Sequence, residues 1–168
     1  MKGEIEWERK FLLKSIPELK NFKKDEITQR YYSGPPKFRL RSINDEIFIA
    51  NKKSNDIHPI EEEINISKEL FYFLGGDFEE NSVSKTRYYI PLEDEYMAEL
   101  DVYKKNLLGL VTVEVEFETE EEMNRFIPPS WFGREVTYVK EFKNRSLAKK
   151  GIPKSIDSSE LFYPIDLK

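Results

Sequence analysis

The chain has 168 residues, of which 39% are hydrophobic and 35% charged, and this size and composition predict one soluble globular domain. No stretch approaches the roughly 18 uncharged apolar residues that a membrane-spanning helix needs, so a membrane protein is not expected. The net charge of −5 argues against a basic surface that binds nucleic acid as a partner. Residues 1–10 are rich in charge and lack the apolar core of a signal peptide, which predicts a cytoplasmic protein.

The supply of reactive side chains limits the chemistry further. The chain has no cysteine and a single histidine, His58. The lack of cysteine excludes a disulfide framework, a cysteine nucleophile and a thiolate metal site. One histidine cannot build a multi-histidine metal site, and the sequence suggests no partners for a serine-histidine-aspartate triad. Any bound metal must therefore be held by carboxylates, which favours hard cations such as Mg²⁺ or Mn²⁺.

Alternation of apolar and polar residues predicts about eight strands. In chain order they span residues 4–13, 27–33, 37–43, 46–53, 60–66, 83–90, 98–102 and 111–117, of which 27–33 shows the weakest pattern. The polar face of several strands carries a formal charge at every second position, as where Glu6, Glu8 and Lys10 share one face. In residues 46–53 the positions of Ile47 and Ile49 place Lys52 on the charged face.

Short helices are predicted where a residue can cap an N-terminus. The expected caps and helices are Ser67 before 68–74, Thr119 with Glu122 before Pro128, and Asn144 for a helix that ends at Gly151. Residues 154–168 are predicted to form a C-terminal tail, so the domain itself is expected to span residues 1–153.

The charges on the strands are largely sorted by sign, which is unusual for a solvent-facing surface. Like charges at alternate positions repel, and they are tolerated where a neighbouring strand carries the opposite sign or a charged ligand lies between them. A closed barrel has no free edge and a narrow interior. We therefore expect a mainly β (α+β) fold, a closed antiparallel barrel of about eight strands that encloses a charged tunnel. The apolar faces would pack outward against the short helices.

The expected inward-facing charges suggest phosphate chemistry. The basic set is Lys10, Arg39, Arg41, Lys52, Lys85 and Arg87, and the acidic set is Glu6, Glu8, Glu61, Glu63, Glu99, Asp101, Glu114 and Glu116. Converging cations can neutralise a triphosphate. The carboxylates would repel the same ligand unless one or two divalent metals bound to them, and metals would then bridge protein to phosphate oxygens. This pattern is typical of a metal-dependent phosphoryl-transfer site, which needs neither histidine nor cysteine.

A series of short motifs resembles one known family, the triphosphate tunnel metalloenzymes, also called the CYTH superfamily. The resemblance covers residues 4 to about 153 in the family's order. The matching segments are ExExK at 6–10, the paired arginines of 38–41, KTRY at 85–88, ELDVY at 99–103, GL at 109–110, EVEF at 114–117, WFGREVT at 131–137 and NRSLA at 144–148.

The resemblance implies roles for residues at matching positions. Phosphate binding is implied for Lys10, Arg39, Arg41, Lys52, Lys85 and Arg87, and metal ligation for Glu6, Glu8, Asp101, Glu114 and Glu116. Among these, Glu6, Glu8, Glu114 and Glu116 are the expected catalytic carboxylates. This chain departs from the family pattern at two places. His58 and Pro59 stand where the family usually carries an arginine, and Ala50 replaces a threonine, so that Lys53 competes with Lys52 for the phosphate-binding role.

The resemblance implies an enzyme that uses Mg²⁺ or Mn²⁺ to hydrolyse a triphosphate, with inorganic tripolyphosphate the leading candidate. A class IV adenylate cyclase and a thiamine or nucleoside triphosphatase are alternative enzymes. A module that only binds triphosphate or polyphosphate is the non-enzymatic alternative. The sequence leaves open the physiological substrate, the choice between hydrolysis and cyclisation, the preferred metal and the oligomeric state.

Overall fold

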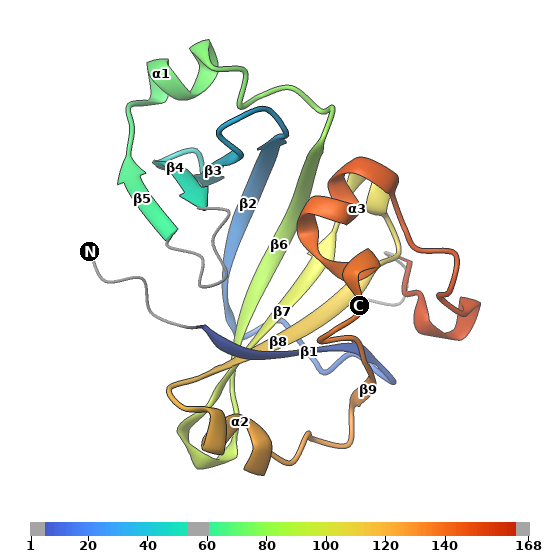
Figure 1. The fold of residues 1–168 in the computed structure, drawn as a ribbon. Coiled ribbons are helices and arrows are strands. Elements are labelled where there is room, and N and C mark those ends of the chain that lie inside the picture. Colours follow the sequence, from blue (N-terminus) through green and yellow to red (C-terminus); the bar gives the residue numbers. More distant parts are fainter. Residues whose placement is uncertain (1–5, 54–60, 164–168) are drawn as a thin grey trace.

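The protein is organised around one antiparallel sheet. The computed structural model describes residues 6–53 and 61–163, and within these ranges nine strands pair in the order β5-β4-β3-β2-β6-β7-β8-β1-β9 (Figure 1). The strands are β1 (Trp7–Leu13), β2 (Lys23–Tyr32), β3 (Phe38–Ile43), β4 (Ile47–Lys53), β5 (Glu61–Asn65), β6 (Ser82–Pro91), β7 (Met97–Tyr103), β8 (Val111–Phe117) and β9 (Phe132–Glu135).

The mainly β architecture is confirmed, but closure of the sheet into a barrel is not. Among the described residues the order ends at β5 on one side and at β9 on the other, and no ladder joins these two strands. The last strand of the order, β9, has four residues, and its pairing with β1 contains a register shift between Phe11 and Leu13. The next helix, α3 (Asn144–Lys150), packs against β6 and β2.

Most strand predictions are confirmed within the described residues. β2 begins at Lys23, earlier than the expected start at Ile27, because it pairs with β6 as far as Tyr89. β9 was not predicted, since its four residues are too few to show an alternating pattern.

Two of the predicted helices have the expected caps. α1 (Lys68–Phe73) begins after Ser67, whose side chain accepts a hydrogen bond from the backbone N–H of Leu70. α2 (Glu120–Arg125) begins after Thr119, whose side chain accepts from the backbone N–H of Glu122. Each cap satisfies a backbone donor that the helix itself leaves free.

The predicted cap of α3 is wrong. Lys143 occupies the cap position and makes no capping bond through its side chain. Asn144 instead accepts a hydrogen bond at Oδ1 from the Tyr103 hydroxyl at 2.6 Å. The side chain that sequence reasoning assigned to the helix terminus therefore ties α3 to the end of β7.

Two of the three apolar clusters, those under α1 and α2, lie on the outer side of the sheet as predicted, whereas the cluster under α3 lies on the inner side, where Val83 pairs with Gln29. Three clusters each pack one helix against the strands: Leu100, Val113 and Val115 with Met123 of α2, Val83 and Leu110 with Leu147 of α3, and Leu40 and Phe48 with Phe71 of α1. Burial of each such side chain contributes about 1.5–3 kcal/mol. Because the two outer clusters take up the apolar faces of β3, β4, β7 and β8, the alternate positions of these strands are left for polar side chains.

The described end of the chain is fixed to the sheet. A 3₁₀ turn at Ser158–Glu160 is capped by Asp157, and Arg134 pairs with Glu160 at 3.1 Å. The backbone N–H of Phe162 donates to the carbonyl of Gly109 at 2.8 Å. Residues 154–163 of the predicted tail are therefore packed, whereas 164–168 lie outside the described residues. In the described ranges, no helix is long and apolar enough to cross a membrane.

Candidate functional site

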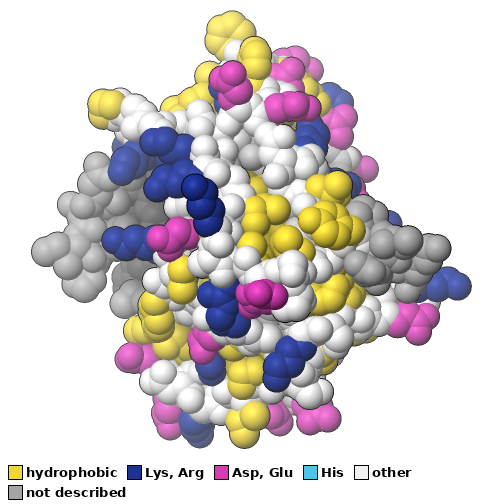
Figure 2. Space-filling model, turned by 90° about the vertical axis from the view of Figure 1, so that its right-hand side faces the viewer, with side chains coloured by type: hydrophobic (Ala, Val, Ile, Leu, Met, Phe, Trp, Pro, Cys, Tyr) yellow, Lys and Arg dark blue, Asp and Glu magenta, His cyan; other side chains and the backbone are white. Residues whose placement is uncertain are grey.

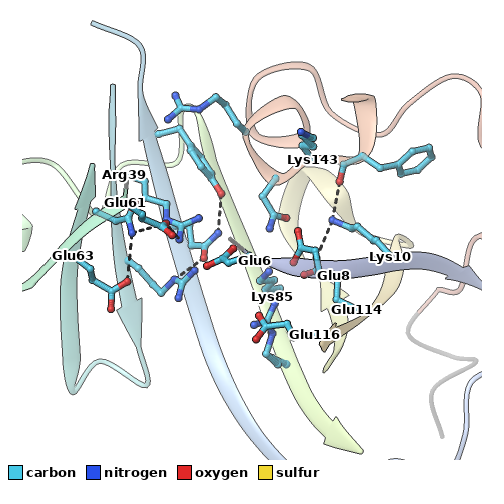
Figure 3. A pocket seen from close by; sticks show the side chains of 18 of the residues that line it. Glu6, Glu8, Lys10, Arg39, Glu61, Glu63, Lys85, Glu114, Glu116 and Lys143 are labelled. Carbon is cyan, nitrogen blue, oxygen red and sulfur yellow. Dashed lines mark hydrogen bonds and ion pairs between the residues drawn. The ribbon is translucent and has the colours of Figure 1, made fainter. Parts of the chain in front are cut away.

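A cavity of about 480 Å³ collects charged side chains from several strands (Figure 3). Its volume lies in the range of small-molecule sites, about 300–1,000 Å³. The carboxylates that line it are Glu6, Glu8, Glu61, Glu63, Glu114 and Glu116. The cations that line it are Lys10, Lys37, Arg39, Arg41, Lys85, Arg87, Lys143 and Arg145. On the face shown in Figure 2, lysine and arginine side chains gather at one side of the view.

Most of the predicted site residues lie together in this cavity. Those present are Glu6, Glu8, Lys10, Arg39, Arg41, Lys85, Arg87, Glu114 and Glu116. We call Glu6, Glu8, Glu114 and Glu116 the acidic wall, which comes from the start of β1 and from β8. We call Arg39, Arg41, Lys85 and Arg87 the basic wall, which comes from β3 and β6. Lys52 and Asp101 are not among the lining residues.

Lys52 is exposed and does not line the cavity, so its placement does not support the predicted role in phosphate binding. Phe48 lies four residues before Lys52 and is buried against Phe71 of α1. The even-numbered positions of β4, which include Lys52, therefore face the outer side of the sheet. Ile47, on which the predicted register relied, is 48% exposed. Asn51 takes the inward position and is buried. The alternative, Lys53, has a side chain outside the described part of the chain.

Asn51 links the cavity to β5. Its Nδ2 donates to Glu61 Oε1 at 2.7 Å and, more weakly, to Glu63 Oε2 at 3.4 Å. Arg39 Nη2 also pairs with Glu61 Oε1 at 3.3 Å. Glu62, between these two carboxylates in sequence, is exposed and does not line the cavity. The alternation predicted for this strand is therefore correct.

Asp101 is fully buried and holds two cations of the basic wall. Its Oδ2 accepts from Lys85 Nζ at 2.6 Å and from Arg87 Nη2 at 2.9 Å, and its Oδ1 accepts from Arg87 Nε at 2.7 Å. Burial alone would raise the pKa of Asp101, but Lys85 and Arg87 outweigh burial and hold that pKa well below its usual range. This placement does not support the predicted metal ligation. Asp101 instead fixes the direction of Lys85 and Arg87.

The acidic wall carries more negative charge than its neighbours neutralise. Glu8 lies directly across the ladder from Glu116, and Lys10 lies across from Glu114. Lys10 Nζ is 3.2 Å from Glu114 Oε1. Burial acts to raise the pKa of Glu114, but Lys10 and Lys85 more than offset it and the pKa is lowered. Desolvation by surrounding side chains, together with Glu114 and Glu6, raises the pKa of Glu8 to about 7.

This excess charge indicates that the acidic wall suits a cation. Carboxylates of this kind are the ligands that hard divalent metals prefer. Within residues 6–53 and 61–163, however, no group of three or more acidic side chains is close enough together to hold a metal ion. The donor chemistry therefore fits a divalent metal, while the side chains are not arranged as a closed cage.

In the basic wall, Arg41 lies among other cations and donates from Nε to the neutral side chain of Gln29. Burial and the neighbouring cations Arg39 and Arg87 lower the pKa of Arg41, because the charged guanidinium is desolvated and repelled. An anion placed among these side chains would relieve that repulsion. The two walls thus call for ligands of opposite charge within one cavity.

Several lining residues were not predicted as site residues. They include Gln29, Tyr31, Lys37, Asn51, Thr137, Lys143, Asn144 and Arg145. Asn144 and Arg145 lie in the NRSLA motif, from which a helix cap but no site residue was predicted. Gln29 and Tyr31 lie in the strand with the weakest pattern and carry no formal charge, so charge sorting could not identify them.

The first turn of α3 and the residues before it are hydrogen-bonded to β1 and β2. Lys10 Nζ donates to the carbonyl of Phe142 at 2.8 Å, and Arg145 Nη1 donates to the carbonyl of Tyr32 at 3.1 Å. Lys143 and Arg145 also line the cavity, and Figure 3 shows Lys143 beside it.

Comparison with known proteins agrees with the geometry of the cavity. No protein-family model matches the sequence. The chain is 39% identical over 146 residues to an inorganic triphosphatase of Nitrosomonas europaea, covering 85% of this chain and 96% of that protein. The crystal structure of an inorganic triphosphatase is similar to it with a TM-score of 0.70 and 38% identity, covering 86% of this chain and 95% of that chain.

A more distant structure shares the fold. It is that of a Hippeastrum protein with a dominant triphosphatase activity, which is 14% identical with a TM-score of 0.53 and covers 71% of this chain and 83% of that chain.

Proposed function

Since the chain belongs to the triphosphate tunnel metalloenzyme (CYTH) superfamily, we propose that it hydrolyses inorganic tripolyphosphate and releases phosphate. The observation that carries the proposal is the pairing of a basic and an acidic wall in one cavity. An anion-binding module would need only the basic wall. The relative that covers most of this chain is an inorganic triphosphatase, which favours the substrate without an organic group.

The basic wall supplies the contacts for the phosphate chain. Arg39 and Arg41 present guanidinium groups that can form forked, charge-assisted hydrogen bonds to phosphate oxygens. Lys85 and Arg87 are held by Asp101 before any ligand arrives, so little rearrangement is needed when phosphate binds.

The acidic wall is the proposed place of a divalent cation, Mg²⁺ or Mn²⁺, with Glu6, Glu8, Glu114 and Glu116 as its candidate ligands. Such a cation would neutralise the carboxylates and polarise the attacking water. The proposed ligands differ from the set expected from sequence by the loss of Asp101, whose oxygens already accept hydrogen bonds from Lys85 and Arg87.

In the reaction, water attacks the terminal phosphorus of tripolyphosphate and the bridging P–O bond breaks. The products are phosphate and pyrophosphate, and pyrophosphate leaves with additional negative charge. The cations of the basic wall can stabilise this developing charge, so catalysis relies on positioning and electrostatics.

A substrate panel tests the proposal. Purified protein is incubated separately with tripolyphosphate, ATP and thiamine triphosphate in the presence of Mg²⁺ or Mn²⁺, and the products are identified by chromatography. We expect phosphate and pyrophosphate from tripolyphosphate, at a kcat/KM well above that for the other two compounds. Cyclic AMP with pyrophosphate from ATP would instead indicate a cyclase. Tight binding of tripolyphosphate with no product would indicate a binding module.

A further inference from the structure

The buried side chain of Gln29 is hydrogen-bonded to two other residues of the cavity, Arg41 and Tyr31. Gln29 lies on β2 directly across the ladder from Arg41 on β3, is 1% exposed and lines the cavity. Its Oε1 accepts from Arg41 Nε at 2.7 Å, and its Nε2 donates to the Tyr31 hydroxyl oxygen at 2.9 Å. Tyr31 shares the inward face of β2 and also lines the cavity.

The arginine decides which way the amide of Gln29 points. A guanidinium only donates hydrogen bonds, so the atom of Gln29 that meets Arg41 must be the carbonyl oxygen. The amide nitrogen is then left for Tyr31, and it can only donate. The hydroxyl of Tyr31 therefore accepts at its oxygen from Gln29, and its own hydrogen is directed to another partner.

We propose that Gln29 is a positioning residue that makes Tyr31 a hydrogen-bond donor to a phosphate oxygen of the substrate. The same contact anchors Arg41 through Nε and leaves the two Nη groups of its guanidinium to bind phosphate. This inference rests on the proposed function, because it takes a phosphate chain as the occupant of the cavity.

The chemistry of the site explains why an amide is needed there. A glutamate would still accept from Arg41, but it would also accept from Tyr31, so the hydroxyl hydrogen would turn away from the cavity. An apolar residue would leave a buried guanidinium nitrogen and a buried hydroxyl without this partner, which is costly. Only a glutamine of this length both accepts from Arg41 and donates to Tyr31.

The test is a double-mutant cycle between Gln29 and Tyr31. Tyr31→Phe, Gln29→Glu and the double variant are compared with wild type for kcat/KM on tripolyphosphate and for its dissociation constant by calorimetry. Tyr31→Phe removes one hydrogen bond to the substrate and should lower kcat/KM about five- to tenfold. In the Gln29→Glu background the same change should have almost no effect, because Tyr31 no longer donates to phosphate.

Gln29→Glu and the double variant both carry the added negative charge, so the comparison between these two variants cancels its effect. Thr28→Val is the matched control on the same strand. Thr28 does not line the cavity and lies near Ser84 on the other face, so the change should leave kcat/KM at the wild-type value. Unfolding midpoints of all variants separate lost stability from lost function.

The outcomes distinguish the two proposals. If wild type is active and Tyr31→Phe costs the same factor in both backgrounds, the role of Gln29 is refuted and the proposed function stands. If wild type neither binds nor hydrolyses tripolyphosphate, both are refuted.

Discussion

The charge of a residue indicates its function only when the strand face on which the residue lies is known. Arg41 and Lys52 carry the same formal charge and were predicted to do the same work. Arg41 lines the cavity, whereas Lys52 is exposed on the other side of the sheet. The difference arises because the apolar core selects the outer face of β4 through Phe48.

The first prediction contrasts these two cations. Arg41→Gln should weaken tripolyphosphate binding by about 2–4 kcal/mol, because a charge-assisted fork is lost and the ligand's charge stays partly unpaired. Lys52→Gln is the matched control and should leave the dissociation constant unchanged. Calorimetric titration of both variants checks this, and a similar loss in Lys52→Gln would show that the register of β4 is wrong.

The second prediction concerns Asp101 and acid stability. Its folded-state pKa is depressed, so its contribution to stability is present above the ordinary aspartate pKa and is lost as the pH falls towards the folded value. Wild type should therefore lose free energy of unfolding steeply below about pH 4. Asp101→Asn should unfold about 3–5 kcal/mol more easily at pH 7, because a buried lysine loses its partner.

The measurement is urea unfolding between pH 2 and 7. In Asp101→Asn the slope of stability against pH in the acid range should be shallower than in wild type. Glu118→Gln, at an exposed carboxylate, is the control and should follow the wild-type curve. Identical acid slopes for Asp101→Asn and wild type would contradict the role given to this ion pair.

At the scale of elements, α3 is attached to the sheet by a hydrogen bond at its N-terminal end and by apolar packing at its middle. The Tyr103 hydroxyl donates to Asn144, and Leu147 packs among Val83 and Leu110. The polar bond therefore sits next to Lys143 and Arg145, the two cations that α3 and its cap residue bring to the cavity.

The third prediction is that Tyr103→Phe loosens α3 without loosening the sheet. Loss of the hydroxyl leaves the Asn144 amide oxygen without its partner, at a cost of about 1 kcal/mol. Amide hydrogen exchange in Asn144–Lys150 should speed up about fivefold, while exchange in β6 and β7 stays at the wild-type rate. Tyr89→Phe removes a hydroxyl bonded to Asp25 instead and should leave α3 unchanged. Equal exchange of α3 in both variants would contradict this attachment.

The elements show where sequence reasoning succeeds and where it stops. Alternation located the apolar faces of β1, β4 and β8 because each of these strands packs one face against α1 or α2. It misplaced Lys52, since Ile47 and Ile49 are apolar without belonging to the outer core under α1. It could not identify Gln29 and Tyr31, because neutral polar residues on an inward face look like those on a solvated one. Asp101 lies on the same face of the sheet as the residues that line the cavity, and it differs from them in that its side chain is fully buried.

At the scale of the whole molecule, the two walls would make the proposed substrate and the proposed metal interdependent. A phosphate chain alone would be repelled by the acidic wall, and a metal alone would be repelled by the basic wall. Each therefore improves the site for the other, which is a positive coupling between two ligands.

The fourth prediction follows from this coupling. EDTA should abolish hydrolysis of tripolyphosphate, and Mg²⁺ or Mn²⁺ should restore it. Ca²⁺ should support little activity, because its looser coordination orients the attacking water poorly. Phosphate release after exhaustive chelation and add-back is the measurement, and full activity without metal would remove the cation from the mechanism.

The role of the acidic wall is tested with two glutamate variants, one inside the wall and one outside it. Glu116→Gln should reduce kcat at least about a hundredfold and raise the metal concentration needed for half-maximal activity, because an amide is a poor ligand for a hard cation. Glu62→Gln, on the outer side of β5, should behave like wild type in both respects. Equal losses in the two variants would place the wrong residues in the wall.

The proposed roles of the two walls would also give the cavity a direction along the phosphate chain. Inorganic tripolyphosphate is the same molecule read from either end, so it can enter with either terminal phosphate leading and reach the same bound state. A nucleotide or thiamine ester has one substituted end, so only one of its two orientations presents a free terminal phosphate to the acidic wall. A directional site therefore favours a symmetric substrate by a statistical factor alone, before any contact with an organic group is made or refused.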